Sequence, residues 1–128
     1  MAFAKALHPD RRTMAQTTDV LGFVERASPD PERQNVTILF TDALESADPK
    51  LNLETSRLSA LNGAHVIEEL ATRRMWSRTA LRGEVHVVLP DAPKAPNCNS
   101  ARELQVFYSA LVKQLGGNLV AFNTYLTL

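Results

Sequence analysis

The residues of this chain that could do chemistry are concentrated in the segment Asn35–Asp48, which reads NVTILFTDALESAD. An apolar run of β-forming residues leads there into Asp42, a carboxylate followed by short polar side chains. A carboxylate just past the end of a strand is a candidate ligand for Mg²⁺, which prefers oxygen donors. The same carboxylate could instead cap the following turn by accepting backbone N–H groups. The sequence leaves both interpretations of Asp42 open.

Other reactive residue types form no pattern that indicates a reaction. His8, His65 and His86 show no metal-ligand spacing and no Ser or Cys partner for nucleophilic catalysis. Cys98 is the only cysteine, which excludes an intrachain disulfide, and it is predicted to be a bystander thiol. Neither G-x-x-x-x-G-K-[ST] nor G-x-G-x-x-G occurs, so nucleotide binding by such loops is not supported.

Composition and charge narrow the class of protein. The length of 128 residues fits one domain, and Lys+Arg and Asp+Glu number 14 each. This balance provides no net field for nucleic acid or an anionic membrane, so we expect neither as a partner. No apolar run is long enough to cross a bilayer or to form a signal peptide, so we expect a cytoplasmic protein. A basic run is predicted to lie on a solvated helix face and its exit loop: Arg73, Arg74, Arg78 and Arg82.

Three segments are predicted to be strands: Val36–Thr41, Glu84–Leu89 and Asn118–Tyr125. The first is apolar on both faces, which is typical of a strand that helices cover on each side. His86 alternates with valines inside the second and is predicted to be packed there or to lie at an edge.

Helices are predicted over roughly Asp19–Ala27, Ala64–Trp76 and Ala101–Leu115. The last has the clearest signal, because Ser100 and Glu103 are spaced as a capping box and apolar residues follow at helical spacing. Helices and strands therefore alternate along the chain, which predicts an α/β fold with a parallel sheet flanked by helices.

In such a sheet, ligands bind outside the carboxyl ends of the strands. Asp42 and Asp91 both follow predicted strands, Val36–Thr41 and Glu84–Leu89, which we expect to be neighbours. The two carboxylates are therefore a candidate pair at one edge of the sheet.

The order of TTDVLGFVERA, VTILFTDALES, LRGEVHVVLP and NLVAF resembles the latter part of a von Willebrand factor type A domain, over roughly Thr17–Tyr125. The resemblance implies a three-layer, Rossmann-like α/β domain at residues 17–128, incomplete and preceded by an N-terminal segment at 1–16. Domains of that family carry a metal-ion-dependent adhesion site, and by position Thr18 and Asp42 match its threonine and its aspartate. An Asp-x-Ser-x-Ser run, which the family places after its first strand, does not occur here.

The resemblance therefore implies a protein-interaction module with an incomplete or degenerate metal site. Any Mg²⁺ would be bound weakly by Asp42 and Thr18 and would bridge to an acidic residue of a partner protein. Thr17 or Thr18 could instead be the N-cap of the helix that begins at Asp19. Two alternatives stay open, namely a small Mg²⁺-dependent hydrolase or phosphotransfer enzyme that uses Asp42 and Asp91, and a structural fragment without a site.

The strand predicted at Val36–Thr41 has a further consequence for partners. Without the family's first strand beside it, this strand lacks a hydrogen-bonding neighbour along one side. An exposed apolar edge is a template for pairing with another chain. We therefore expect self-association through Val36–Thr41, unless residues 1–8 cover the edge.

Overall fold

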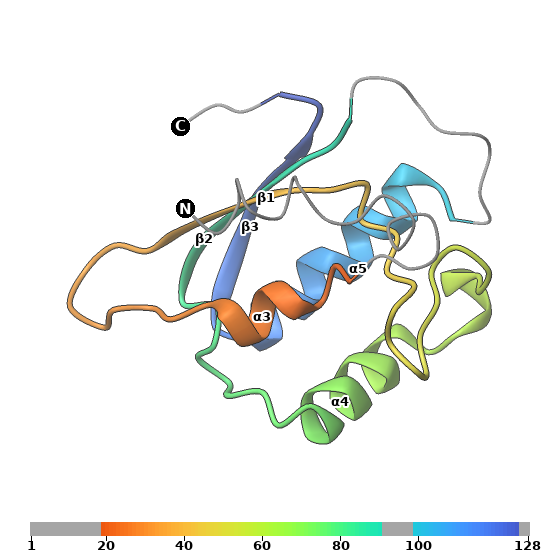
Figure 1. Ribbon diagram of the computed structural model, residues 1–128, viewed down its shortest axis with the longest axis horizontal. Coiled ribbons are helices and arrows are strands. Elements are labelled where there is room, and N and C mark those ends of the chain that lie inside the picture. The colour runs from red at the N-terminus through yellow and green to blue at the C-terminus, as the bar shows by residue number, and fades with distance from the viewer. Residues whose placement is uncertain (1–18, 91–98, 126–128) are drawn as a thin grey trace, which may run out of the picture.

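The computed structural model describes residues 19–90 and 99–125 (Figure 1). Thr18, Asp91 and Cys98 lie outside the described residues, as do residues 1–8. The described elements are, in chain order, α3 (Gly22–Arg26), β1 (Val36–Phe40), the 3-10 helix η1 (Leu58–Ala60), α4 (Gly63–Arg73), β2 (Gly83–Val88), α5 (Ala101–Gln114) and β3 (Gly117–Asn123). Among them, no helix has the length and apolar character that crossing a membrane requires.

The strands form a parallel sheet with the order β1-β2-β3. Val36 pairs with Glu84 at one end of the β1–β2 ladder, and Phe40 pairs with Val88 at the other. The β2–β3 ladder contains a register shift after Val85. The mixed α/β class, the parallel direction and the predicted strand neighbours are therefore confirmed.

The hydrophobic core lies between one face of the sheet and the helices α3, α4 and α5 (Figure 1). Val85 and Val87 of β2 and Phe122 of β3 join the core from the sheet. On the opposite face of β1, the exposed fractions of Val36, Ile38 and Phe40 are 46%, 36% and 50%. Among the described residues, helices thus cover one face of the sheet, whereas the sequence predicts helices on both sides of Val36–Thr41.

A side-chain cap marks the start of α5, whereas the N-cap of α3, Leu21, makes no side-chain cap hydrogen bond. The Ser100 hydroxyl accepts a hydrogen bond from the Glu103 amide at 3.1 Å, and the Glu103 carboxylate accepts one from the Ser100 amide at 3.0 Å. This is the predicted capping box. Asp19, predicted to open the first helix, lies before it, and its Oδ1 accepts a hydrogen bond from the Gly22 amide at 2.9 Å.

Helix α4 ends three residues earlier than predicted, at Arg73 instead of Trp76. The Trp76 amide donates to the Ala71 carbonyl at 2.9 Å and the Met75 amide to the Thr72 carbonyl at 3.3 Å. This pair of bonds is the Schellman motif, in which the residue after the C-cap is left-handed. Met75 occupies that position with a φ of 58°.

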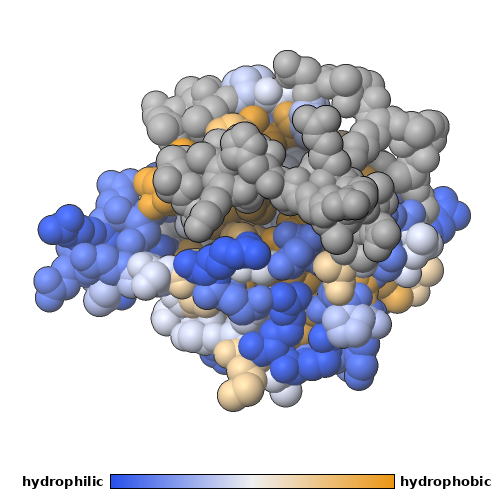
Figure 2. Space-filling view, in the orientation of Figure 1, coloured by the Kyte–Doolittle hydropathy of each residue, from blue (hydrophilic) through white to orange (hydrophobic). Residues whose placement is uncertain are grey.

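On the face shown in Figure 2, hydrophilic residues gather over α4 and over the loop between α3 and β1.

Candidate functional site

Asp42 lies in a tight turn directly after β1. Its Oδ1 accepts a hydrogen bond from the Leu44 amide at 3.0 Å, and the Thr41 hydroxyl accepts one from the Ala43 amide at 3.1 Å. Ala43 adopts a left-handed backbone, with a φ of 66°. Asp42 therefore caps the turn, which is one of the two interpretations that the sequence leaves open. Its role as a metal ligand stays a prediction.

Tyr108 of α5 holds this turn from the core. Its buried hydroxyl donates a hydrogen bond to the Ala43 carbonyl at 2.8 Å. Burial raises the pKa of Tyr108 well above its ordinary value, and the nearby carboxylates Glu45 and Asp42 raise it further. The hydroxyl therefore keeps its proton at neutral pH and acts as a fixed donor to the turn.

The predicted cation ligands are not brought together by the described residues. Thr18 and Asp91 lie outside those residues, so their distances from Asp42 are not defined. Within 19–90 and 99–125, no group of three or more His, Cys, Asp or Glu side chains could hold a metal ion. The described residues do not make up a cation site by themselves, and the pairing of Asp42 with Thr18 stays a prediction.

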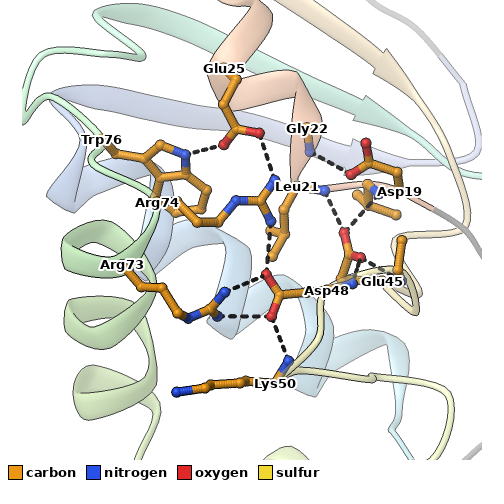
Figure 3. A network of polar contacts seen from close by, with 12 residues as sticks. Asp19, Leu21, Gly22, Glu25, Glu45, Asp48, Lys50, Arg73, Arg74 and Trp76 are labelled. Atoms are coloured by element: carbon orange, nitrogen blue, oxygen red, sulfur yellow. Dashed lines mark hydrogen bonds and ion pairs between the residues drawn. The ribbon is translucent and has the colours of Figure 1, made fainter.

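Glu45 is a fully buried carboxylate in the loop after β1 (Figure 3). Its Oε1 accepts hydrogen bonds from the amides of Val20 and Leu21 at 2.8 and 2.7 Å. Its Oε2 accepts them from the amides of Ala47 and Asp48 at 2.7 and 2.8 Å. One side chain thus joins the segment before α3 to the loop after β1.

Asp48 carries a second buried carboxylate in the same loop. Arg73 contacts its Oδ1 at 2.8 Å, Arg74 contacts its Oδ2 at 3.0 Å, and the Lys50 amide donates to Oδ1 at 2.9 Å. Burial opposes ionisation of Asp48, but the hydrogen bonds from Arg73 and Lys50 and the two guanidinium charges outweigh it. The pKa of Asp48 is therefore lowered.

The ion pairs extend to α3 through Glu25 (Figure 3). Arg74 contacts Glu25 at 2.6 Å and lies over the Trp76 ring at 5.3 Å from its centroid, while the Trp76 indole N–H donates to Glu25. We call Glu25, Asp48, Arg73, Arg74 and Trp76 the Asp48 network. It clamps α3, the loop after β1 and the end of α4 together.

The Asp48 network corrects one prediction about charge. Side chains of Arg73 and Arg74 are only 24% and 18% exposed, because they neutralise a buried carboxylate. The prediction of a solvated helix face is wrong for these two residues. It is right for Arg78, whose side chain is 78% exposed.

Sequence reasoning missed the roles of Glu45 and Asp48. The one available signal is their spacing, because Asp42, Glu45 and Asp48 succeed one another at intervals of three residues and each accepts nearby backbone N–H groups. Short acidic residues in a turn commonly do this. The distant partners of Glu45, just before α3, and of Asp48, at the end of α4, leave no mark in the local pattern.

His86 is a buried titratable residue within the sheet. It lies in β2 on the face opposite the core, 2% exposed, with its Nε2 3.1 Å from Glu84 Oε1. Its Nδ1 has no hydrogen-bond partner among the described residues. The prediction that His86 is packed within the strand is confirmed.

Comparisons with known proteins find no relative of this chain. No family model, no curated protein and no solved structure matches this chain. Its function is therefore inferred from its own residues and from its fold.

Proposed function

We propose that this chain is a protein-interaction module of the von Willebrand type A kind, and that the edge of β1 is its contact surface. The proposal includes a three-layer, Rossmann-like sheet that continues beyond β1 when a partner strand is present. The sequence resemblance and the parallel order β1-β2-β3 support it. The observation that carries it is the edge of β1 opposite β2, along which no strand of the described residues pairs.

Backbone geometry indicates which groups of β1 face away from the sheet. The Glu84 amide donates to the Asn35 carbonyl at 2.9 Å, and the Thr41 amide donates to the Val88 carbonyl at 3.1 Å. Because backbone groups alternate sides along a strand, odd-numbered residues of β1 point their N–H and C=O groups to β2. The backbone groups of Val36 and Ile38 therefore point away from β2, where no strand within residues 19–90 and 99–125 pairs with them.

The side chains of β1 do not protect this edge. Natural edge strands commonly avoid pairing through Lys, Pro, a bulge or an inward-pointing charge. The strand VTILF has none of these residues, and its ladder with β2 is regular. Val36 and Ile38 are also 46% and 36% exposed. An extended segment of another protein that adds to this edge would gain backbone hydrogen bonds and apolar contacts together.

For the chain alone, the expected partner is a second copy. Two β1 strands can pair in an antiparallel manner around a twofold axis, which brings the same patch of each copy together. No charged side chain of β1 opposes this pairing, since VTILF is uncharged.

Sedimentation velocity over a wide concentration range tests the proposal. We expect the wild type to self-associate and Ile38→Lys to remain monomeric, because the lysine places a charge on the edge. Val106→Lys is the matched control, since Val106 is 61% exposed on α5 and lies off the sheet. A wild type that stays monomeric at every concentration, or an Ile38→Lys variant that associates equally, would refute the edge as the contact surface.

The divalent cation implied by the resemblance is a separate part of the proposal. The sequence lacks the family's Asp-x-Ser-x-Ser run, and Asp42 is the one predicted ligand among the described residues. Binding by Asp42 and Thr18 is therefore expected to be weak, and protein contact through β1 does not depend on it.

A further inference from the structure

A small pocket lies at the amino end of the sheet, where the loop that leads into β1 and the loop that leads into β2 meet (Figure 1). Its volume is about 170 Å³. Pockets that hold drug-sized ligands have volumes of roughly 300–1,000 Å³. The pocket therefore has room for a small ion or for one functional group of a larger ligand. It lies at the opposite end of β1 from Asp42.

Three residues with hydrogen-bond donors in their side chains line this pocket, and each comes from a different segment. Ser28 lies in the loop after α3, Thr37 lies in β1, and Arg82 lies in the loop before β2. In the part of the chain that the structure describes, none of these three side chains makes a hydrogen bond or an ion pair. Two hydroxyls and one guanidinium are therefore available to a ligand.

The charge of the pocket favours an anion. Among the described residues, Arg82 is the only charged residue that lines it. Neighbouring acidic residues such as Asp30 and Glu84 do not line it, and they contact Arg33 and His86 respectively. The carboxyl end of α3 borders the pocket as well. A helix end carries about half an elementary charge, however, whereas the guanidinium carries a full one.

Hydrogen bonds within the chain fix the walls of the pocket. The Asn35 side chain bonds to the amide and the carbonyl of Asp30 at 2.9 Å each, and the Asn35 carbonyl accepts a hydrogen bond from the Glu84 amide at 2.9 Å. In the other loop, the Leu81 amide donates to the Leu115 carbonyl at 3.0 Å. Both loops are thus tied to the sheet or to the end of α5. A ligand therefore meets a pocket that needs little ordering, which lowers the cost of binding.

We propose that this pocket binds a phosphate group, with Arg82, Ser28 and Thr37 as its donors. A guanidinium offers paired N–H groups that match two oxygens of a phosphate. The hydroxyls come from two other segments and can donate to the remaining oxygens of a tetrahedral anion. A carboxylate holds its two oxygens in one plane, so it meets donors from three segments less well. Phosphate binding at this end of the sheet does not depend on self-association through β1.

Two variants and one control separate the charge from the hydroxyls. Arg82→Gln removes the charge and keeps most of the side-chain length. Thr37→Val removes one hydroxyl and keeps a β-branched side chain in the strand. Arg78→Gln is the matched control, because Arg78 lies in the same connection between α4 and β2, its side chain is 78% exposed, and it does not line the pocket.

Nuclear magnetic resonance titration of the isotope-labelled full chain measures binding residue by residue. The probes are inorganic phosphate, methyl phosphate and acetate, all at one ionic strength. We expect saturable shifts of the Ser28, Thr37 and Arg82 amides with inorganic phosphate, with a dissociation constant on the order of 1 mM, and much weaker binding of acetate. Arg82→Gln should weaken phosphate binding roughly tenfold and Thr37→Val roughly fivefold, whereas Arg78→Gln should leave it unchanged. Thermal melting by circular dichroism checks that each variant is folded.

Methyl phosphate identifies the source of the phosphate group. Binding of both phosphates supports a site for a phosphorylated ligand, and binding of inorganic phosphate alone supports a site for the free ion. The proposal is overturned by any of three results: no saturable shifts with either phosphate, equal affinity for acetate, or an Arg82→Gln variant that binds phosphate as well as Arg78→Gln does.

Discussion

Replacing Glu45 by glutamine tests whether this buried carboxylate holds the fold together. The change is nearly isosteric, but it exchanges one acceptor oxygen for an NH₂ group. Whichever way the amide turns, that NH₂ group faces two backbone N–H donors, either Val20 and Leu21 or Ala47 and Asp48. Two hydrogen bonds are lost, and two donors remain without a partner.

The cost depends on how buried these donors are. A buried donor without a partner costs about 1–3 kcal/mol. The amide will turn its NH₂ group towards Ala47 and Asp48, because the Ala47 contact is only partly buried. We therefore expect Glu45→Gln to lower the free energy of unfolding by about 3 kcal/mol, a large part of the 5–15 kcal/mol typical of a domain.

Urea unfolding followed by far-ultraviolet circular dichroism measures this loss, provided that the slope of the transition is unchanged. Glu32→Gln is the control, because Glu32 is exposed and the charge change is the same. We expect that control to stay within about 0.5 kcal/mol of the wild type. A loss below about 1 kcal/mol for Glu45→Gln would refute the reasoning, because the four amides would then be satisfied without the carboxylate.

The Asp48 network, the end of α4 and the turn after β1 each allow a further prediction. Because the pKa of Asp48 is lowered in the folded state, its stabilising contribution should be present above its ordinary value of 3.8 and be lost as the pH falls below it. Urea titrations at several pH values should show this dependence in the wild type and a shallower one in Asp48→Asn. Met75→Gly should raise the free energy of unfolding by about 0.5–1 kcal/mol, because Met75 is left-handed and 88% exposed; an unchanged melting temperature would contradict this. Calorimetric titration should show Mg²⁺ binding that is on the order of millimolar or weaker. Asp42→Ala should abolish this binding and cost about 1 kcal/mol of stability, and equal heats from both proteins would leave Asp42 as a cap only.

Local signals account for the parts of the fold that could be predicted. The capping box of α5 lies within four consecutive residues, Ser100 to Glu103, and needs no distant partner. The strands were recognisable because β-branched residues are concentrated in short runs between turns. The end of α4 was misplaced because a Schellman motif usually carries glycine, whereas Met75 occupies the left-handed position here.

Distant contacts account for most of what could not be predicted. Arg73 and Arg74 look like surface residues in the local sequence, and their partner Asp48 lies 25 and 26 residues away. Glu45 likewise accepts hydrogen bonds from amides 24 and 25 residues earlier in the chain. The exposure of one face of β1 was missed for a related reason, since an apolar run alone does not indicate whether a second layer covers it. For the candidate site, the sequence was enough to place Asp42 in the turn after β1. It was not enough to show which other side chains lie beside Asp42.

The position of Trp76 gives the chain an internal reporter of local opening. Trp76 is the only tryptophan; it is partly buried against the core and contacts Glu25 of α3 and Arg74, the C-cap of α4. Its fluorescence should respond when α3, a helix of only five residues, separates from the end of α4. Far-ultraviolet circular dichroism reports on the whole chain instead. A fluorescence transition that precedes the dichroism transition would therefore reveal that α3 is released as a separate unit before the sheet unfolds.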